Sequence, residues 1–200
     1  QGGPLSTAEL SLDEAKQEII HFAEICRREV GFIRSAVSAK TKAEWESANE
    51  KLVKYENITD KIEYEIASYL NEVTKGDISA FSALRIKSMY RVIGELESIG
   101  DSGEAIGRMM KRALDHGKTF DEEMIKRLDR MLDLLDVAFG AMTENLSSPA
   151  LFLKDITNAE DAEYNINEYR NRLREEHIVN IEKDDYNYQT GVFYIDIVQE

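Results

Sequence analysis

Two segments of the sequence carry acidic residues at the same spacing. Each has a Glu, an Asp four positions later and a second Glu three positions after that; the two sets are Glu56, Asp60, Glu63 and Glu97, Asp101, Glu104. In a helix these positions share one face, where like charges repel by roughly 0.2–0.5 kcal/mol per pair. A hard cation removes that repulsion, because Mg, Ca, Mn or Fe ions bind several carboxylate oxygens together. The duplicated spacing therefore indicates a candidate metal site with these six residues as ligands.

A third segment repeats the pattern in part. Glu163 and Asn167 match its first two positions, with Asn in place of Asp, and Arg170 stands where the last Glu would be. Glu163 and Arg170 also fall on the predicted apolar stripe of their helix. An ion pair, with each other or with an acid on the following helix, is therefore the favoured interpretation of these two residues. The segment indicates a second and weaker candidate site.

Four glycines interrupt the helix that carries the second acidic set. They are Gly94, Gly100, Gly103 and Gly107. Each costs about 1 kcal/mol relative to Ala in a helix interior. We therefore expect something to approach this helix closely, either a neighbouring helix or a bound ligand.

Residues for catalysis do not form a recognisable pattern. A di-iron carboxylate bundle needs Glu-x-x-His on two helices, and Glu18-Ile-Ile-His21 supplies it once, because the other two histidines lack a Glu at that spacing. A Gly-rich phosphate loop, a nucleophile elbow and a Cys–His pair are absent from the sequence. We therefore expect a function other than catalysis.

The composition narrows the class of protein. The chain of 200 residues has 25 basic and 39 acidic residues and a net charge of −14, so we expect no binding to nucleic acid. Hydrophobic residues make up 42% of the chain, enough for a core, and only two residues are proline, which favours long helices. The single Cys26 excludes a disulfide within the chain and a cysteine zinc site.

Apolar residues at alternating spacings of three and four predict helices at about 12–38, 42–76, 78–116, 120–146, 149–181 and from about 186. Capping residues mark the starts: capping boxes at Ser11, Thr41 and Thr119, a cap at Asp77, and Ser148 followed by Pro149. Short turns between long helices require antiparallel neighbours. The predicted fold class is all-α, an antiparallel helical bundle.

The predicted helices divide into two groups of three. We expect an N-terminal linker at 1–10, a first three-helix repeat at 11–117 and a second at 118–200, with its last helix truncated. The core stripe of the first helix is expected to be Ala15, Ile19, Phe22, Cys26, Val30, Ile33 and Val37. That of the third helix is expected to be Ile78, Phe81, Leu84, Val92, Leu96, Ile99, Ile106 and Met110.

The acidic segments resemble those of the PhoU family. Members carry Glu-x-x-x-Asp pairs on the second and third helices of a three-helix unit, and 94–101 reads Gly-Glu-Leu-Glu-Ser-Ile-Gly-Asp, close to the family's Glu-Leu-Glu-Arg-Ile-Gly-Asp. Ser98 departs from that phrase. The second half, with Glu163-x-x-Ile-Asn167 and Leu173-Arg174-x-x-His177, is similar to the PhoU-like domain at the C-terminus of bacterial sodium/phosphate cotransporters. The resemblance covers the chain from Leu5 onward.

The resemblance implies twin three-helix bundles that bind metal clusters and regulate phosphate transport or phosphate signalling. It implies Glu56, Asp60, Glu97 and Asp101 as ligands, Glu63 and Glu104 as further candidates, and Glu163 and Asn167 in the second repeat. The ion could be Fe, Mn, Mg, Ca or Zn, because oxygen ligands do not choose among them.

The resemblance also implies a partner and a location. The partner is a membrane phosphate transporter, either part of the same longer chain or a separate protein, and the domain lies at the cytoplasmic face of the inner membrane. The resemblance does not decide whether the domain forms a homodimer. By the same resemblance, 191–200 parallels the approach to Glu95, so the sequence stops two residues before the acid expected on the last helix and the second site is incomplete.

A metal-free helical scaffold or oligomerisation module is the alternative interpretation. In that case the paired acids form a solvated face and bind no ion. Metal content distinguishes the two hypotheses directly.

Overall fold

The computed structural model describes residues 4–147, 157–182 and 188–200, which form six helices and no strand. The helices are α1 (Pro4–Val37), α2 (Lys42–Thr74), α3 (Ala80–Asp115), α4 (Glu122–Ser147), α5 (Thr157–Glu182) and α6 (Tyr188–Gln199). The predicted all-α helical bundle is confirmed. None of the described helices combines the length and the apolar composition that crossing a membrane requires.

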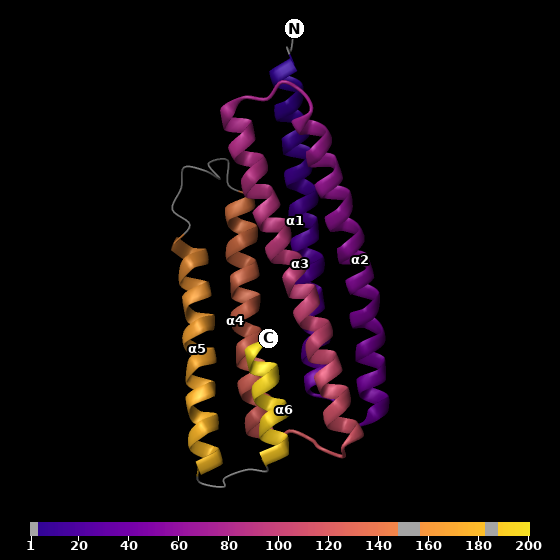
Figure 1. The fold of residues 1–200 in the computed structure, drawn as a ribbon, viewed down its shortest axis with the longest axis vertical. Coiled ribbons are helices and arrows are strands. Elements are labelled where there is room, and N and C mark those ends of the chain that lie inside the picture. Colours follow the sequence, from indigo (N-terminus) through magenta and orange to yellow (C-terminus); the bar gives the residue numbers. More distant parts are fainter. Residues whose placement is uncertain (1–3, 148–156, 183–187) are drawn as a thin grey trace.

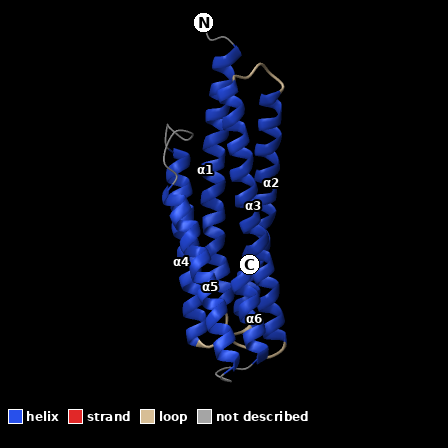
Figure 2. Cartoon of the chain, turned by 60° about the vertical axis from the view of Figure 1, so that its left-hand side comes forward, coloured by secondary structure: helices blue, strands red, loops and turns tan. Residues whose placement is uncertain are grey.

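The helices run along one long axis and form an elongated bundle (Figures 1 and 2). α1, α2 and α3 each pack against the other two. α4 lies beside α1, α5 lies beside α4, and α6 contacts α3, α4 and α5. α6 has 12 residues against 36 in α3, so it covers only part of the length of the bundle (Figure 1).

α1 is the central helix of the core: it contacts α2, α3 and α4, and it supplies more buried apolar residues than any other described helix. Its predicted stripe is confirmed as buried: Ala15, Ile19, Phe22, Cys26, Val30, Ile33 and Val37. Burying one large apolar side chain contributes roughly 1.5–3 kcal/mol relative to leaving it exposed. This burial fixes which face of α1 is turned toward α2 and α3.

The first helix begins earlier than predicted, and the second begins at its predicted cap. α1 begins at Pro4 rather than near residue 12, so most of the expected linker is helical. Proline is tolerated in a first turn, where its missing N–H would have no partner. At the start of α2 the predicted capping box is confirmed: the Thr41 side chain accepts from the Glu44 amide, and the Glu44 carboxylate accepts from the Thr41 amide.

Two later helices begin at caps other than those predicted. Ser79, not Asp77, caps α3 through its side chain, and Asp121, not Thr119, accepts a first-turn amide of α4. Each pair of candidates lies within two residues, a difference that capping propensity alone does not decide. The predicted starts at Ser148 and near residue 186 lie outside the described residues.

The predicted stripe of the third helix is wrong in its first turns. Phe81 is 49% exposed and Leu84 is 59% exposed. The buried positions there are Ser82, Ile86 and Met89, which are spaced by four and three and lie on another face of the helix from the predicted ones. Both sets of positions fit a helical period. Ser82 can occupy an inward position because its side chain is small and its hydroxyl accepts a hydrogen bond from the Ser79 hydroxyl at 3.1 Å.

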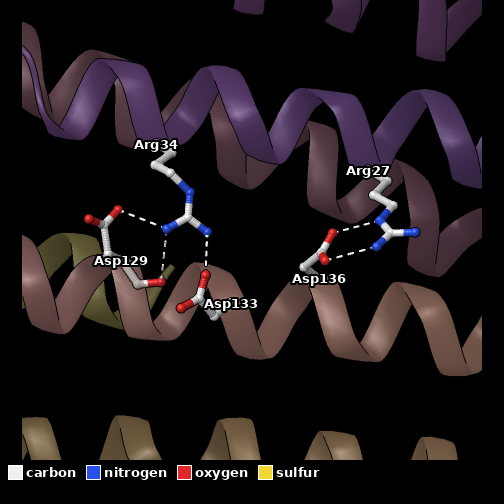
Figure 3. Close-up of polar contacts among 5 residues, drawn as sticks. All are labelled: Arg27, Arg34, Asp129, Asp133 and Asp136. Atoms are coloured by element: carbon white, nitrogen blue, oxygen red, sulfur yellow. Dashed lines mark hydrogen bonds and ion pairs between the residues drawn. The ribbon is translucent and has the colours of Figure 1, made fainter.

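Two arginines of α1 join it to α4 (Figure 3). Arg34 donates to the carboxylates of Asp129 and Asp133 at 2.9 and 2.7 Å. Arg27 donates two hydrogen bonds to the carboxylate of Asp136, at 2.6 and 2.9 Å. The three aspartates recur at spacings of four and three on α4, so the arginines fix how α4 lies along α1. These side chains are roughly one third to one half exposed, and salt therefore screens the pairs.

We expect Arg34→Gln to lower the free energy of unfolding by about 1 kcal/mol at low ionic strength, the upper end for exposed ion pairs. The variant also leaves Asp129 and Asp133 as like charges one turn apart. Urea unfolding at low and high salt measures the effect. Arg91→Gln is the control, because Arg91 pairs with Glu95 within a single helix, and it should cost less than half as much. Equal losses in both variants would show that the α1–α4 pairs add nothing.

Candidate metal centre

The packing of α2 against α3 brings the two acidic sets together. Asp60 of α2 acts electrostatically on Glu56 of its own helix and on Glu97 of α3. Asp101 of α3 acts on Glu56, and Glu63 of α2 acts on Glu97. With Glu104, which hydrogen-bonds Glu56, all six predicted ligands of the first half form one group.

Glu29 of α1 approaches this group from the third helix. Its side chain is 0% exposed, and neither carboxylate oxygen has a hydrogen-bond partner among the described residues. Burial, followed by the charges of Glu56, Asp60 and Asp101, raises the pKa of Glu29 to about 7. We call the seven residues together the acid cluster: Glu29, Glu56, Asp60, Glu63, Glu97, Asp101 and Glu104.

Three carboxyl groups of the acid cluster, Glu29, Glu56 and Glu97, have pKa values above the usual range for carboxyl groups. Burial, then hydrogen bonding to Glu104 and the neighbouring negative charges, raises the pKa of Glu56 to about 7. Burial, and next the charge of Asp101, raises the pKa of Glu97. Hydrogen bonds from Arg108 and Glu56 lower the pKa of Glu104. Glu56 therefore keeps a proton more readily than Glu104, whose negative charge Arg108 stabilises.

Two of the four glycines let α3 approach its neighbours. A β-carbon at Gly103 would lie 3.1 Å from Cδ1 of Ile33 and 3.2 Å from Oε1 of Glu29, so the absence of a side chain there makes room for the buried carboxylate. A β-carbon at Gly107 would lie 3.3 Å from the Asn49 side chain, and the Gly107 carbonyl accepts from the Trp45 indole at 3.2 Å. The tight-packing interpretation is confirmed at these positions.

The other two glycines give no evidence of a close approach to α3. Gly94 has open space where a β-carbon would stand. Gly100 lies outside the residues whose surroundings are described. The close approach that the glycines predicted is therefore located in the second half of α3, next to the acid cluster.

The donor set of the acid cluster suits a hard cation, although the side chains do not surround one. Among the described residues, no three Asp, Glu, His or Cys side chains converge as a ready-formed metal cage. Like charges without a counter-charge separate, and Asp60 and Asp101 extend into solvent. The base that pairs with the cluster is Arg108, 2.6 Å from Glu104. Seven carboxyl groups against one guanidinium leave negative charge that a cation can neutralise.

The second predicted set does not form a comparable group in the described part of the chain. Glu163 is exposed on α5 rather than on the core stripe, and Asn167 and Arg170 are half-buried. Burial lowers the pKa of His177, and the negative charge of Asp196, the acid on α6, acts in the opposite direction. The inward positions of α5 are Ala162, Leu173 and His177, so the predicted placement of Glu163 on the stripe is wrong.

Sequence reasoning missed Glu29, which completes the acid cluster from α1. The signal was present: Glu29 lies three residues after Cys26 and four before Ile33, on the predicted stripe of the first helix. A carboxyl group at a core position needs a proton or a counter-charge, and the acidic sets on the next two helices have the same need. Val30 also fits that stripe, and so Glu29 was not singled out.

Comparison with known proteins does not assign the chain to a family. No protein-family model matches the chain, and no curated protein matches it. The likeness to PhoU proteins therefore rests on the residues quoted above.

The raised pKa values predict that the metal-free protein loses stability as pH rises. Glu29 and Glu56 keep their protons to about pH 7 when folded, whereas in the unfolded chain they lose them near pH 4.5. The free energy of unfolding should therefore fall between about pH 4.5 and 7 and level off above. Thermal unfolding in chelator-containing buffer across this range measures it.

Glu29→Gln removes one of the two ionisations without changing the shape of the side chain. At pH 8 without metal we expect its melting temperature to exceed that of the parent by on the order of 5 °C, and its pH dependence to be shallower. Glu24→Gln, on an exposed position of the same helix, should shift the melting temperature by less than about 1 °C. Stability that is constant from pH 4.5 to 7 in the parent would contradict these pKa shifts.

Proposed function

We propose that the acid cluster binds a divalent or trivalent metal ion between α1, α2 and α3. The observation that carries the proposal is Glu29, a fully buried carboxyl group with no hydrogen-bond partner among the described residues, near enough to acids on two other helices for their charges to raise its pKa. An ionised carboxylate in that position is costly without a counter-charge. A cation supplies the counter-charge and replaces the proton that the group otherwise keeps.

The ligands would come from three helices. Glu29 would hold the ion from the core side, Glu56 and Asp60 from α2, and Glu97 and Asp101 from α3. Glu63 and Glu104 are the outer candidates, and Glu104 is already charged beside Arg108. Because the ion would join carboxylates that now repel one another, binding would draw α2 and α3 together on α1 and stiffen this part of the bundle.

The wider role that we propose is regulatory and does not involve catalysis. The resemblance of the acidic segments to those of PhoU proteins supports a metal-binding domain that acts on phosphate transport or phosphate signalling. Its partner would be a membrane phosphate transporter, such as a sodium/phosphate cotransporter of which it forms the cytoplasmic domain. Metal occupancy would set the stiffness of α1–α3, and the surface of the bundle would transmit it by contact.

Elemental analysis by plasma mass spectrometry tests the proposal. The purified chain, loaded with Fe, Mn, Mg, Ca or Zn and then desalted, should hold at least one of these metals in stoichiometric amount. Glu97→Gln combined with Asp101→Asn should lose it, because both remove a charged oxygen ligand. Glu163→Gln should leave the metal content unchanged, since Glu163 lies on α5, which among the described helices packs on α4 and α6 and not on those of the acid cluster.

The matched control is Glu65→Gln combined with Glu72→Gln. These two acids are exposed on α2, pair with Lys61 and Lys75, and belong to a helix that contributes ligands. The control removes as much charge as the test variant and should retain the metal. Helical circular dichroism should be the same in all variants. A parent chain that holds no metal after loading would refute the proposal and favour the metal-free scaffold.

A further inference from the structure

A second polar site lies at the end of the bundle where two connections meet. The turn between α1 and α2 and the turn between α3 and α4 line an open cavity of about 200 Å³. Three of its lining residues are Lys40, Lys42 and Lys118, against a single acid, Asp115. In a chain with 39 acidic and 25 basic residues, this local excess of positive charge runs against the overall composition.

Helix-terminal chemistry brings the three lysines to one place. Gly117 adopts φ 66°, which ends α3 so that the amide of Lys118 donates to the Ala113 carbonyl at 2.8 Å and that of Gly117 to Leu114 at 2.9 Å. This glycine-dependent turn folds Lys118 back over the end of the helix. On the other side, the Thr41 cap fixes the start of α2 between Lys40 and Lys42.

The lysine charges are poorly neutralised by the protein itself. Among the described residues, the ammonium groups of Lys40 and Lys118 have no carboxylate within ion-pair distance, and Lys42 is 4.0 Å from Glu46. The Glu44 carboxylate accepts hydrogen bonds from the backbone amides of Lys40 and Thr41 at the cap. The negative carbonyl end of α3 lies at the same cavity, so the attraction for an anion comes from the lysines and not from the helix dipoles.

We propose that this cavity binds a phosphate-class oxyanion, held by the ammonium groups of Lys40, Lys42 and Lys118. Lysine is a point charge with three donors, which suits an oxyanion that offers several acceptor oxygens. The site is separate from the acid cluster: Lys42 and Glu56 are 14 residues apart on α2, roughly 20 Å along the helix. It does not rest on metal binding.

The test is a calorimetric titration of inorganic phosphate into the full chain in chelator-containing buffer, which keeps metal-bound phosphate at the acid cluster out of the signal. We expect saturable binding with one phosphate per chain. The triple variant Lys40→Gln, Lys42→Gln, Lys118→Gln should weaken it by about tenfold or more, because charge-assisted hydrogen bonds are lost. Lys118→Gln alone should give a smaller loss in the same direction.

The matched control is Lys54→Gln, Lys87→Gln, Lys126→Gln. These lysines are exposed on α2, α3 and α4 and their removal changes the net charge equally. The control should bind phosphate as the parent does. Thermal unfolding of every variant verifies that the bundle is intact.

A second arm identifies the source of the phosphate group. Flotation with vesicles of phosphatidylglycerol in phosphatidylcholine measures binding to lipid headgroups, which the net charge of −14 opposes. Phosphate binding that depends on the three lysines supports the site with a free ion, and vesicle binding that depends on them supports it with a headgroup. Binding to neither, or an equal loss in the control triple variant, would overturn the proposal.

Discussion

The structure depends on how α1, α2 and α3 accommodate a carboxyl group in their shared core. Glu29 is fully buried without a hydrogen-bond partner among the described residues, and the helices packed on it present six further acids. Apolar packing on both sides of Glu29, from Cys26 and Ile33, prevents α1 from rotating the carboxyl group into solvent without exposing the core. The group must therefore keep a proton or acquire a cation. If Glu29 keeps a proton, the stability of the bundle depends on pH. If it binds a cation, the stability depends on the concentration of the free metal ion.

The rest of the bundle holds this arrangement in place. Gly103 gives the Glu29 carboxylate its space, and the bond from Trp45 to the Gly107 carbonyl ties α2 to α3 on the same side. α4 is attached to the other side of α1 by Arg27 and Arg34, so α1 carries the acid cluster on one face and the second group of helices on another. A change in the packing of α2 and α3 on α1 can therefore reach α4 through a single helix. This connection gives the proposed regulatory role a physical route.

The sequence predicted the features that depend on periodicity and on local spacing. The helices, the stripe of α1, the Thr41 capping box and the meeting of two acidic sets all follow from patterns within one or two helices. The exposed positions of Phe81 and Leu84 did not follow, because two registers of α3 are equally periodic and tertiary contacts choose between them. Glu29 was missed for a related reason: its burial depends on three helices together. The lysine-lined cavity joins two turns 75 residues or more apart, a proximity that no local pattern contains.

The central claim is that a cation replaces the proton on Glu29, and the most direct measurement is the metal-induced shift in melting temperature at pH 7.5 for the parent and for Glu29→Gln. The account predicts that the order of the two melting temperatures reverses between metal-free and metal-saturated buffer. Without metal, Glu29→Gln melts higher, because it lacks the buried ionisation; with saturating Mn²⁺ or Fe²⁺, the parent gains stability and overtakes the variant, because only the parent offers the buried charged ligand. An equal metal-induced shift in both proteins would contradict the account, and so would no shift in the parent.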